Sequence, residues 1–119
     1  MAKILIVDDS RTSRKILKNI LELHNYDIVG EAVNGEEGFE KYIELKPDVV
    51  TLDITMPVLD GISSLKKIID YDPKACVIMV TAAGQKNKMV DAIKSGASEF
   101  IQKPFEPDQI LTVLNEVLE

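Results

Sequence analysis

The hydrophobic positions of this chain form short blocks that alternate with segments of helical spacing. Blocks of strand length, rich in apolar residues, lie at residues 4–7, 28–33, 49–52, 77–80 and 100–101. Between and after them, apolar side chains recur every three or four residues, as on one face of a helix. These helical positions are Ile16, Leu17, Ile20 and Leu21; Phe39, Tyr42 and Ile43; Ile62, Leu65, Ile68 and Ile69; Met89, Val90 and Ile93; and Ile110, Leu111, Leu114, Val117 and Leu118. The pattern predicts five repeats of a strand followed by a helix.

Turn signals separate these blocks and agree with the predicted repeats. Asn34-Gly35, Asp60-Gly61, Asp72-Pro73 and Ser95-Gly96 fall between blocks, and Pro107-Asp108 is a helix start signal. Regular alternation of strands and helices predicts a parallel sheet with helices on both faces, because the crossovers are right-handed. We therefore expect residues 1–119 to form one α/β domain, a flavodoxin-like doubly wound (βα)5 fold. The strand order expected for it is 2-1-3-4-5, which is the order known for folds of this class.

The composition limits the possible functions. A net charge of −6 disfavours binding to nucleic acids or anionic membranes, so we expect cations or basic protein surfaces as partners. No apolar run reaches the roughly 20 residues of a membrane span, and the N-terminus has no apolar signal segment, which predicts a cytoplasmic protein. His24 and Cys76 are the only residues of their types, which excludes an internal disulfide, the usual zinc sites and a Ser-His-Asp triad. We expect Cys76 to be a buried, inert thiol.

Three aspartates follow apolar blocks. Asp8 and Asp9 come after the first block, and Asp53 comes after the third. If these strands are neighbours in a parallel sheet, the three carboxylates meet at one edge. Unit charges about 4 Å apart repel by about 4 kcal/mol at an effective dielectric constant near 20. Such a cluster predicts a bound cation.

The residues expected around the aspartates favour phosphate chemistry at a magnesium site. Carboxylate oxygens without soft ligands favour Mg2+, whose remaining ligands are commonly water and phosphate. Thr81 ends the fourth strand block and Lys103 follows the fifth, and both side chains suit phosphoryl oxygens. No serine or cysteine has a histidine to activate it, so a carboxylate is the candidate nucleophile, and Asp53 is the best placed.

Four segments together resemble the signature of two-component response regulator receiver domains. They are Ile6-Val7-Asp8-Asp9-Ser10, Leu52-Asp53-Ile54-Thr55-Met56-Pro57 with Asp60-Gly61, Val80-Thr81-Ala82-Ala83-Gly84-Gln85, and Ile101-Gln102-Lys103-Pro104-Phe105. They occur in the family's order and span the chain. Among receivers, four segments resemble single-domain chemotaxis regulators of the CheY type: Glu31-Ala32-Val33-Asn34-Gly35, Lys46-Pro47-Asp48, Asp53-Ile54-Thr55-Met56-Pro57 and Ala83-Gly84-Gln85.

The resemblance implies a role for each matching residue. Asp53 would accept a phosphoryl group from a histidine kinase, so the protein would be a signalling phosphoprotein and not a classical enzyme. Asp9 and Asp53 would bind Mg2+ directly, Asp8 largely through water, and the Thr55 carbonyl would complete the protein ligands. Lys103 would contact the phosphoryl group.

The family also implies a switch. Thr81 would close on the phosphoryl group, and Phe100 would turn into the space that Thr81 leaves. The surface of the fourth helix, fifth strand and fifth helix would then change shape. The Lys103-Pro104 bond would be cis.

The resemblance further implies partners: a CheA-like histidine kinase, a downstream protein such as a flagellar motor switch protein, and a phosphatase. We expect a monomer. Alternatives within the family are a phosphorelay intermediate, a phosphate sink, or a receiver excised from a larger regulator.

Other interpretations of these residues are open at this point. Asp8 or Asp9 could cap the helix that follows them. Thr81 could be an ordinary strand residue, Lys103 a solvated one, and Phe100 a core residue. A flavin electron carrier could share the fold, although Asp8-Asp9 would repel its phosphate. A phosphatase resembling the haloacid dehalogenase family would need an aspartate at the position of Thr55.

Overall fold

The computed structural model describes residues 2–119, and strands alternate with helices throughout them. The elements are β1 (Lys3–Val7), α1 (Arg11–Leu23), β2 (Asp27–Ala32), α2 (Gly35–Leu45), β3 (Val49–Asp53), α3 (Gly61–Tyr71), β4 (Val77–Thr81), α4 (Lys86–Lys94), β5 (Glu99–Gln102) and α5 (Pro107–Leu118). Each predicted strand block overlaps a strand, and Pro107 opens α5 as the start signal predicts. The predicted repeat of strand and helix is confirmed.

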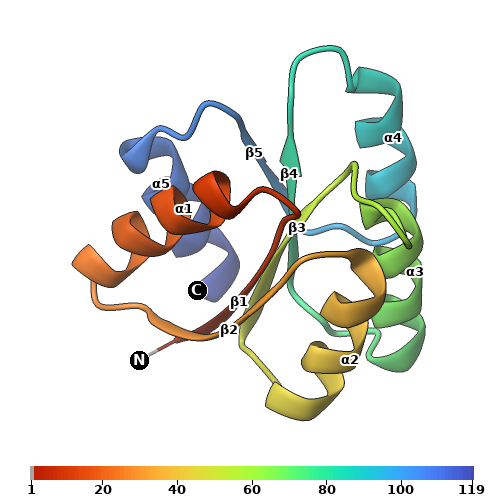
Figure 1. Cartoon of the computed structure of the whole chain (residues 1–119), viewed down its shortest axis with the longest axis horizontal. Coiled ribbons are helices and arrows are strands. Elements are labelled where there is room, and N and C mark those ends of the chain that lie inside the picture. Colours follow the sequence, from red (N-terminus) through yellow and green to blue (C-terminus); the bar gives the residue numbers. More distant parts are fainter. Residues whose placement is uncertain (1) are drawn as a thin grey trace.

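The strands form one parallel sheet in the order β2-β1-β3-β4-β5, which confirms the expected doubly wound fold. Helices α1 and α5 lie on one face of the sheet, and α2, α3 and α4 lie on the other (Figure 1). The direction of the winding reverses between β1 and β3. In open α/β sheets, ligands bind outside the carboxyl ends of the strands at this point.

Each face of the sheet has its own hydrophobic core. Under α2, α3 and α4, the core includes Val50, Leu52, Leu65 and Met79. Under α1 and α5, it includes Ile4, Leu17, Ile78, Ile101 and Leu114. The strands β1, β3 and β4 are buried on both sides, which explains why their sequences are almost continuously apolar.

Helix α4 departs from the apolar stripe seen in the sequence. The helix forms, but Val90 is 49% exposed and Ile93 is 58% exposed. Its contact with the core runs instead through the fully buried Ala92 and the partly buried Met89. Because alanine is small, the spacing of the larger side chains did not indicate the buried face. Two large apolar side chains are therefore exposed on α4.

Three smaller sequence expectations have mixed outcomes. Cys76, which precedes β4, is only partly buried and not fully buried as we expected. The Lys103-Pro104 bond is cis, as the family resemblance implies. None of the described helices is long and apolar enough to span a membrane.

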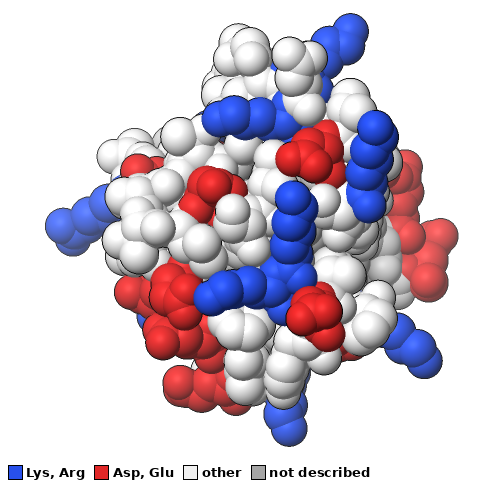
Figure 2. Space-filling model, turned by 90° about the vertical axis from the view of Figure 1, so that its right-hand side faces the viewer, with Lys and Arg blue, Asp and Glu red and all other residues white. Residues whose placement is uncertain are grey.

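The charged side chains on the face covered by α2, α3 and α4 are mixed in sign. Positively charged side chains lie among aspartates and glutamates there, with no single-sign surface across the whole view (Figure 2). On this face, Lys67 pairs with Glu36 at 2.9 Å and Lys41 pairs with Glu37 at 3.3 Å. Such exposed pairs contribute little stability each.

Candidate functional site

The three aspartates predicted for the site lie together at the carboxyl ends of the strands. Asp8 and Asp9 follow β1, and Asp53 is the last residue of β3, which pairs directly with β1. One carboxylate oxygen from each aspartate lies within 4.8 Å of those of the other two. Asp8 and Asp53 are buried, whereas Asp9 is exposed. The predicted convergence of three acids at one edge is confirmed.

Lys103 directly follows β5 and reaches this cluster from two strands away from β3. Its ammonium group lies 2.9 Å from Asp8 Oδ2 and 3.5 Å from Asp53 Oδ2. Its backbone N–H donates to the Thr81 carbonyl at 2.8 Å, which holds the end of β4 beside it. Burial lowers the pKa of Lys103, but the contacts with Asp8 and Asp53 outweigh this effect, so its pKa is raised. Lys103 is a charged member of the site and not an ordinary solvated lysine.

Asp53 is unusually easy to protonate. Its pKa is raised from 3.8 to about 6, first because burial disfavours the charged carboxylate, and second because the negative Asp8 lies nearby. Lys103 lowers the pKa but does not cancel these two causes. The repulsion that we predicted among the acids is therefore present, although desolvation is the larger cause.

The local structure does not support the interpretation of Asp8 or Asp9 as a helix cap. Ser10 is the N-cap of α1, and its hydroxyl accepts a hydrogen bond from the Ser13 N–H at 3.2 Å. Asp8 Oδ1 instead accepts from the Ser10 N–H at 2.9 Å, while its other oxygen contacts Lys103. Both oxygens of Asp8 therefore have protein partners, and Asp9 remains exposed.

The loop after Asp53 is held close to the site by a glycine. The Gly61 N–H donates to the Ile54 carbonyl at 2.7 Å. A Cβ atom on Gly61 would lie 2.0 Å from the Asp53 carbonyl oxygen, which is much too close. The sequence marks Asp60-Gly61 as a turn, but gives no sign that this glycine packs on the backbone of Asp53.

Val58 occupies a strained conformation in the same loop. Its φ is 69°, in the left-handed region that β-branched residues disfavour. The Leu59 N–H donates to the Pro57 carbonyl at 2.8 Å and closes a tight turn around Val58. The side chain is 82% exposed, so packing does not compensate for the strain. Nothing in the sequence indicates this conformation.

The remaining predicted residues are placed as follows. Thr81 is buried at the end of β4. The hydroxyl of Thr55 accepts a hydrogen bond from Gln85 Nε2 at 2.9 Å, which links the loops after β3 and β4. The role of the Thr55 main-chain carbonyl as a metal ligand stays a prediction. Phe100 is partly buried and packs against the core under α2, α3 and α4, and its role as a switch also stays a prediction.

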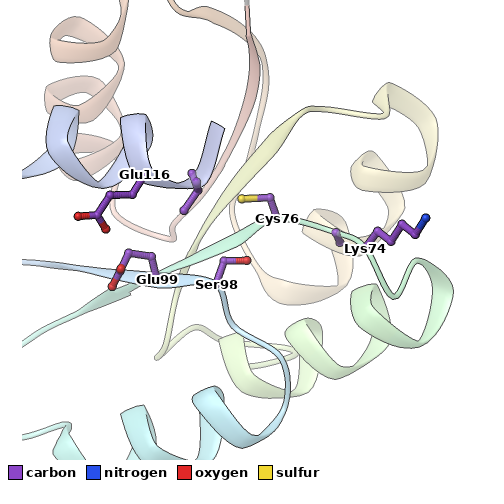
Figure 3. Close-up of a pocket in the computed structure, with 7 residues that line it drawn as sticks. Lys74, Cys76, Ser98, Glu99 and Glu116 are labelled. Carbon is purple, nitrogen blue, oxygen red and sulfur yellow. The ribbon is translucent and has the colours of Figure 1, made fainter. Parts of the chain in front are cut away.

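A separate hollow lies at the opposite end of the strands, where β4 and β5 begin. Lys74, Cys76, Ser98, Glu99 and Glu116 line this hollow of about 440 Å³ (Figure 3). Burial raises the pKa of the Cys76 thiol, and a hydrogen bond with Ser98 offsets only part of this. The reactive thiolate is thus disfavoured, so the hollow offers no activated nucleophile. The acid cluster is the better candidate.

The fold and the acid cluster together place three carboxylates and one lysine at the switch point of a doubly wound parallel sheet. The family model described as "Response regulator receiver domain" matches residues 4–115, so the chain belongs to that family.

Within the family, the chain is similar to chemotaxis proteins. It is 51% identical over 116 residues to the chemotaxis protein CheY of Listeria monocytogenes, and the match covers 98% of each chain. It is 49% identical over 115 residues to CheY of Thermotoga maritima, a match that covers 97% of this chain and 96% of the relative. A CheX–CheY–BeF3–Mg2+ complex from Borrelia burgdorferi contains a chain of similar structure, with a TM-score of 0.94, 38% identity, and coverage of 99% of this chain and 90% of that one. The chain is a CheY-like receiver domain.

The acid cluster fits the magnesium ion that receiver domains bind. Three aspartates and Lys103 leave a formal charge of −2, which one divalent cation would cancel. The group contains hard carboxylate oxygens and no thiolate or imidazole, which favours Mg2+ over zinc or copper. Asp8, Asp9 and Asp53 are the residues that would hold the ion.

Proposed function

We propose that residues 1–119 act as a single phosphorylation-activated receiver domain in chemotaxis, with Asp53 as the phosphoacceptor. The observation that carries this proposal is the convergence of Asp8, Asp9 and Asp53 with the ammonium group of Lys103 at the switch point of the sheet. CheY-like receivers belong to two-component signalling. The phosphoryl transfer and the motor partner are our proposals for this chain.

Asp53 is the best nucleophile of the three acids because it is buried at the end of a central strand beside the cation of Lys103. Asp53 Oδ2 lies 3.5 Å from the Lys103 ammonium group. Asp8 uses both oxygens for Ser10 and Lys103, and Asp9 lies on the exposed side of the cluster. Buried beside a cation, Asp53 is the carboxylate that a phosphoryl donor can reach and that the protein can hold still.

In the proposed transfer, an oxygen of Asp53 forms a bond to the phosphorus of a phosphohistidine. The P–N bond breaks, and the histidine nitrogen keeps its electron pair. Lys103 neutralises charge on the phosphoryl oxygens, and the Thr81 hydroxyl donates a hydrogen bond to one of them. A bound Mg2+ would supply further charge stabilisation at these oxygens. The same residues would support slow self-phosphorylation from small donors and self-dephosphorylation.

The output surface in this proposal is formed by α4, β5 and α5. Phosphorylation would draw Thr81 toward the new oxygens, and Phe100 would turn into the space beside β5. Val90 and Ile93 are exposed on α4, where they offer apolar contacts to a protein partner. Because residue 100 is a phenylalanine, it cannot contribute the hydroxyl that a tyrosine would offer there.

The proposal includes specific partners and a cellular location. A CheA-like histidine kinase would donate the phosphoryl group, a flagellar motor switch protein would receive the signal, and a phosphatase would end it. The chain would act as a monomer in the cytoplasm, with no nucleic acid or membrane partner. Within the same family, a phosphorelay intermediate, a phosphate sink and a receiver excised from a larger regulator are the alternatives.

Mass spectrometry after incubation with acetyl phosphate and Mg2+ tests the central step. We expect an addition of about 80 Da to the unaltered protein and none to Asp53→Asn. Asp48→Asn, which removes an exposed carboxylate outside the cluster, is the matched control and should be modified normally. Addition of the same mass to Asp53→Asn would show that another residue is the acceptor. Capture of partners with the beryllium trifluoride form would then separate a motor protein from the alternatives.

A further inference from the structure

Arg14 is a largely buried arginine beside the acid cluster that the sequence did not mark as part of the site. It lies in the first turns of α1, and its side chain is only 14% exposed. Its Nη1 donates to the main-chain carbonyl of Asp8 at 2.8 Å, and its Nε donates to Glu31 at 3.1 Å. One guanidinium group therefore links α1, the end of β1 and the end of β2.

The carbonyl that Arg14 holds belongs to the peptide that joins Asp8 to Asp9. Asp8 has other attachments, because its N–H donates to the Ala32 carbonyl at 3.0 Å and its carboxylate contacts Ser10 and Lys103. The exposed carboxylate of Asp9 forms no hydrogen bond or ion pair with residues 2–119. The position of the Asp9 carboxylate thus depends on its backbone, which begins at the peptide that Arg14 fixes.

We propose that Arg14 is a positioning residue for the cation site. Arg14 holds the Asp8–Asp9 peptide so that the Asp9 carboxylate stays near the Asp53 carboxylate. This inference rests on the proposed binding of Mg2+ by the acid cluster. The contact with Glu31 anchors the guanidinium group, and a planar fork with several donors suits two such contacts better than an ammonium group does.

The charge of Arg14 and its positioning role have opposite effects on cation binding. A positive charge near the cluster repels Mg2+, so its removal by itself would strengthen binding. Loss of the hydrogen bond to the Asp8 carbonyl would instead weaken binding, because the ligand would have to be ordered when the ion binds. The sign of the change in affinity therefore separates the two effects.

Lys18 provides a matched control. Its ammonium group also faces Glu31, at 3.6 Å, but it lies one helical turn further along α1. Lys18→Met therefore removes one positive charge beside the Glu31 carboxylate and leaves the contact between Arg14 and Asp8 in place. Arg14→Lys keeps the charge and can replace only one of the two contacts of the arginine.

Titration of the full chain with Mg2+ by isothermal calorimetry tests the inference. We expect Arg14→Met to weaken Mg2+ binding by about ten-fold or more, Arg14→Lys to lie between it and the unaltered chain, and Lys18→Met to stay within about two-fold. Binding by Arg14→Met that equals or exceeds that of the unaltered chain would overturn the inference. An equal loss in Lys18→Met would do the same.

Thermal unfolding separates positioning from general stabilisation. A purely structural role would lower the Tm of Arg14→Met without Mg2+ and leave the Mg2+-induced rise in Tm unchanged, which would overturn the inference. The positioning role requires a smaller rise in Arg14→Met and, to a lesser degree, in Arg14→Lys. If the unaltered chain itself failed to bind Mg2+, the proposed function would fail, whatever the role of Arg14.

Discussion

Replacement of Asp53 by asparagine should stabilise the protein at neutral pH in the absence of Mg2+. Asparagine has nearly the same shape and carries no charge, so it avoids the two causes that disfavour the carboxylate. These causes are burial at the end of β3 and the negative charge of Asp8, which Lys103 only partly offsets. A carboxylate that weakens its own fold is consistent with a site made for a cation.

The size of the effect follows from the raised pKa of Asp53. Its pKa rises from 3.8 to about 6. A difference of roughly two pH units corresponds to about 3 kcal/mol if it is fully expressed. Because the site opens to solvent at the sheet edge, screening reduces this value, and we expect about 1–2 kcal/mol. For a domain of this size, the Tm should rise by about 4–8 °C.

The direction of the pH dependence is fixed by the raised pKa. The folded protein holds the Asp53 proton more tightly than the unfolded chain does. The stabilisation from the protonated side chain is therefore complete below about pH 3.8 and is lost as the pH rises through about 6. The advantage of Asp53→Asn should be small at pH 4 and should reach its full size above about pH 7.

Circular dichroism during thermal unfolding, in dilute solution with a metal chelator, checks this prediction between pH 4 and pH 8. Asp27→Asn, which removes an exposed carboxylate at the start of β2, controls for the change in net charge. Addition of Mg2+ should raise the Tm of the unaltered chain more than that of Asp53→Asn. A difference in Tm that does not change with pH, or a less stable Asp53→Asn, would refute the reasoning.

Three further substitutions test the surroundings of Asp53. Val58→Asn should raise the free energy of unfolding by about 0.5–1.5 kcal/mol in urea titrations, because asparagine tolerates the left-handed conformation, and an unchanged value would show that the turn is not strained. Gly61→Ala should lower the free energy of unfolding by about 2 kcal/mol or more, since a Cβ atom would lie 2.0 Å from the Asp53 carbonyl oxygen. An unchanged free energy of unfolding would contradict that close contact. Lys103→Met should raise the pKa of Asp53 by about one pH unit, measured by NMR of the carboxyl carbon, because the cation that lowers it is lost; a constant pKa would contradict the ion pair.

The sequence predicted the fold and the charged centre of the site for one shared reason. Strands buried on both faces need continuous apolar residues, so their ends are visible in the sequence, and polar residues at those ends must meet if the strands are neighbours. Asp8, Asp53 and Thr81 could be assigned in this way, since each lies at the end of a buried strand or directly after it.

Features that depend on packing between helices and loops were not predictable from the pattern. Arg14 looks like a solvated residue of α1, because its two partners are distant in sequence and one is a backbone carbonyl. Val58 adopts a conformation that its own residue type disfavours, so a local rule predicts the opposite. The buried face of α4 depends on Ala92, which is too small to dominate an apolar pattern.

The small buried face of α4 would allow a change at Asp53 to reach a partner, as the proposed function requires. Thr81 ends β4 just before the loop that leads to α4. Gly84 in that loop has a φ of 85°, a conformation that glycine adopts more readily than other residues because it has no Cβ atom. Helix α4 has only nine residues and no side-chain cap at its start. Its core contacts, Ala92 and Met89, belong to the same cluster as Phe100. If a hydrogen bond to a phosphoryl oxygen shifted Thr81, the loop before α4 and the packing under α4 would therefore change together. Helix α4 should move more easily than α3, because α3 is longer and has a side-chain cap at its start.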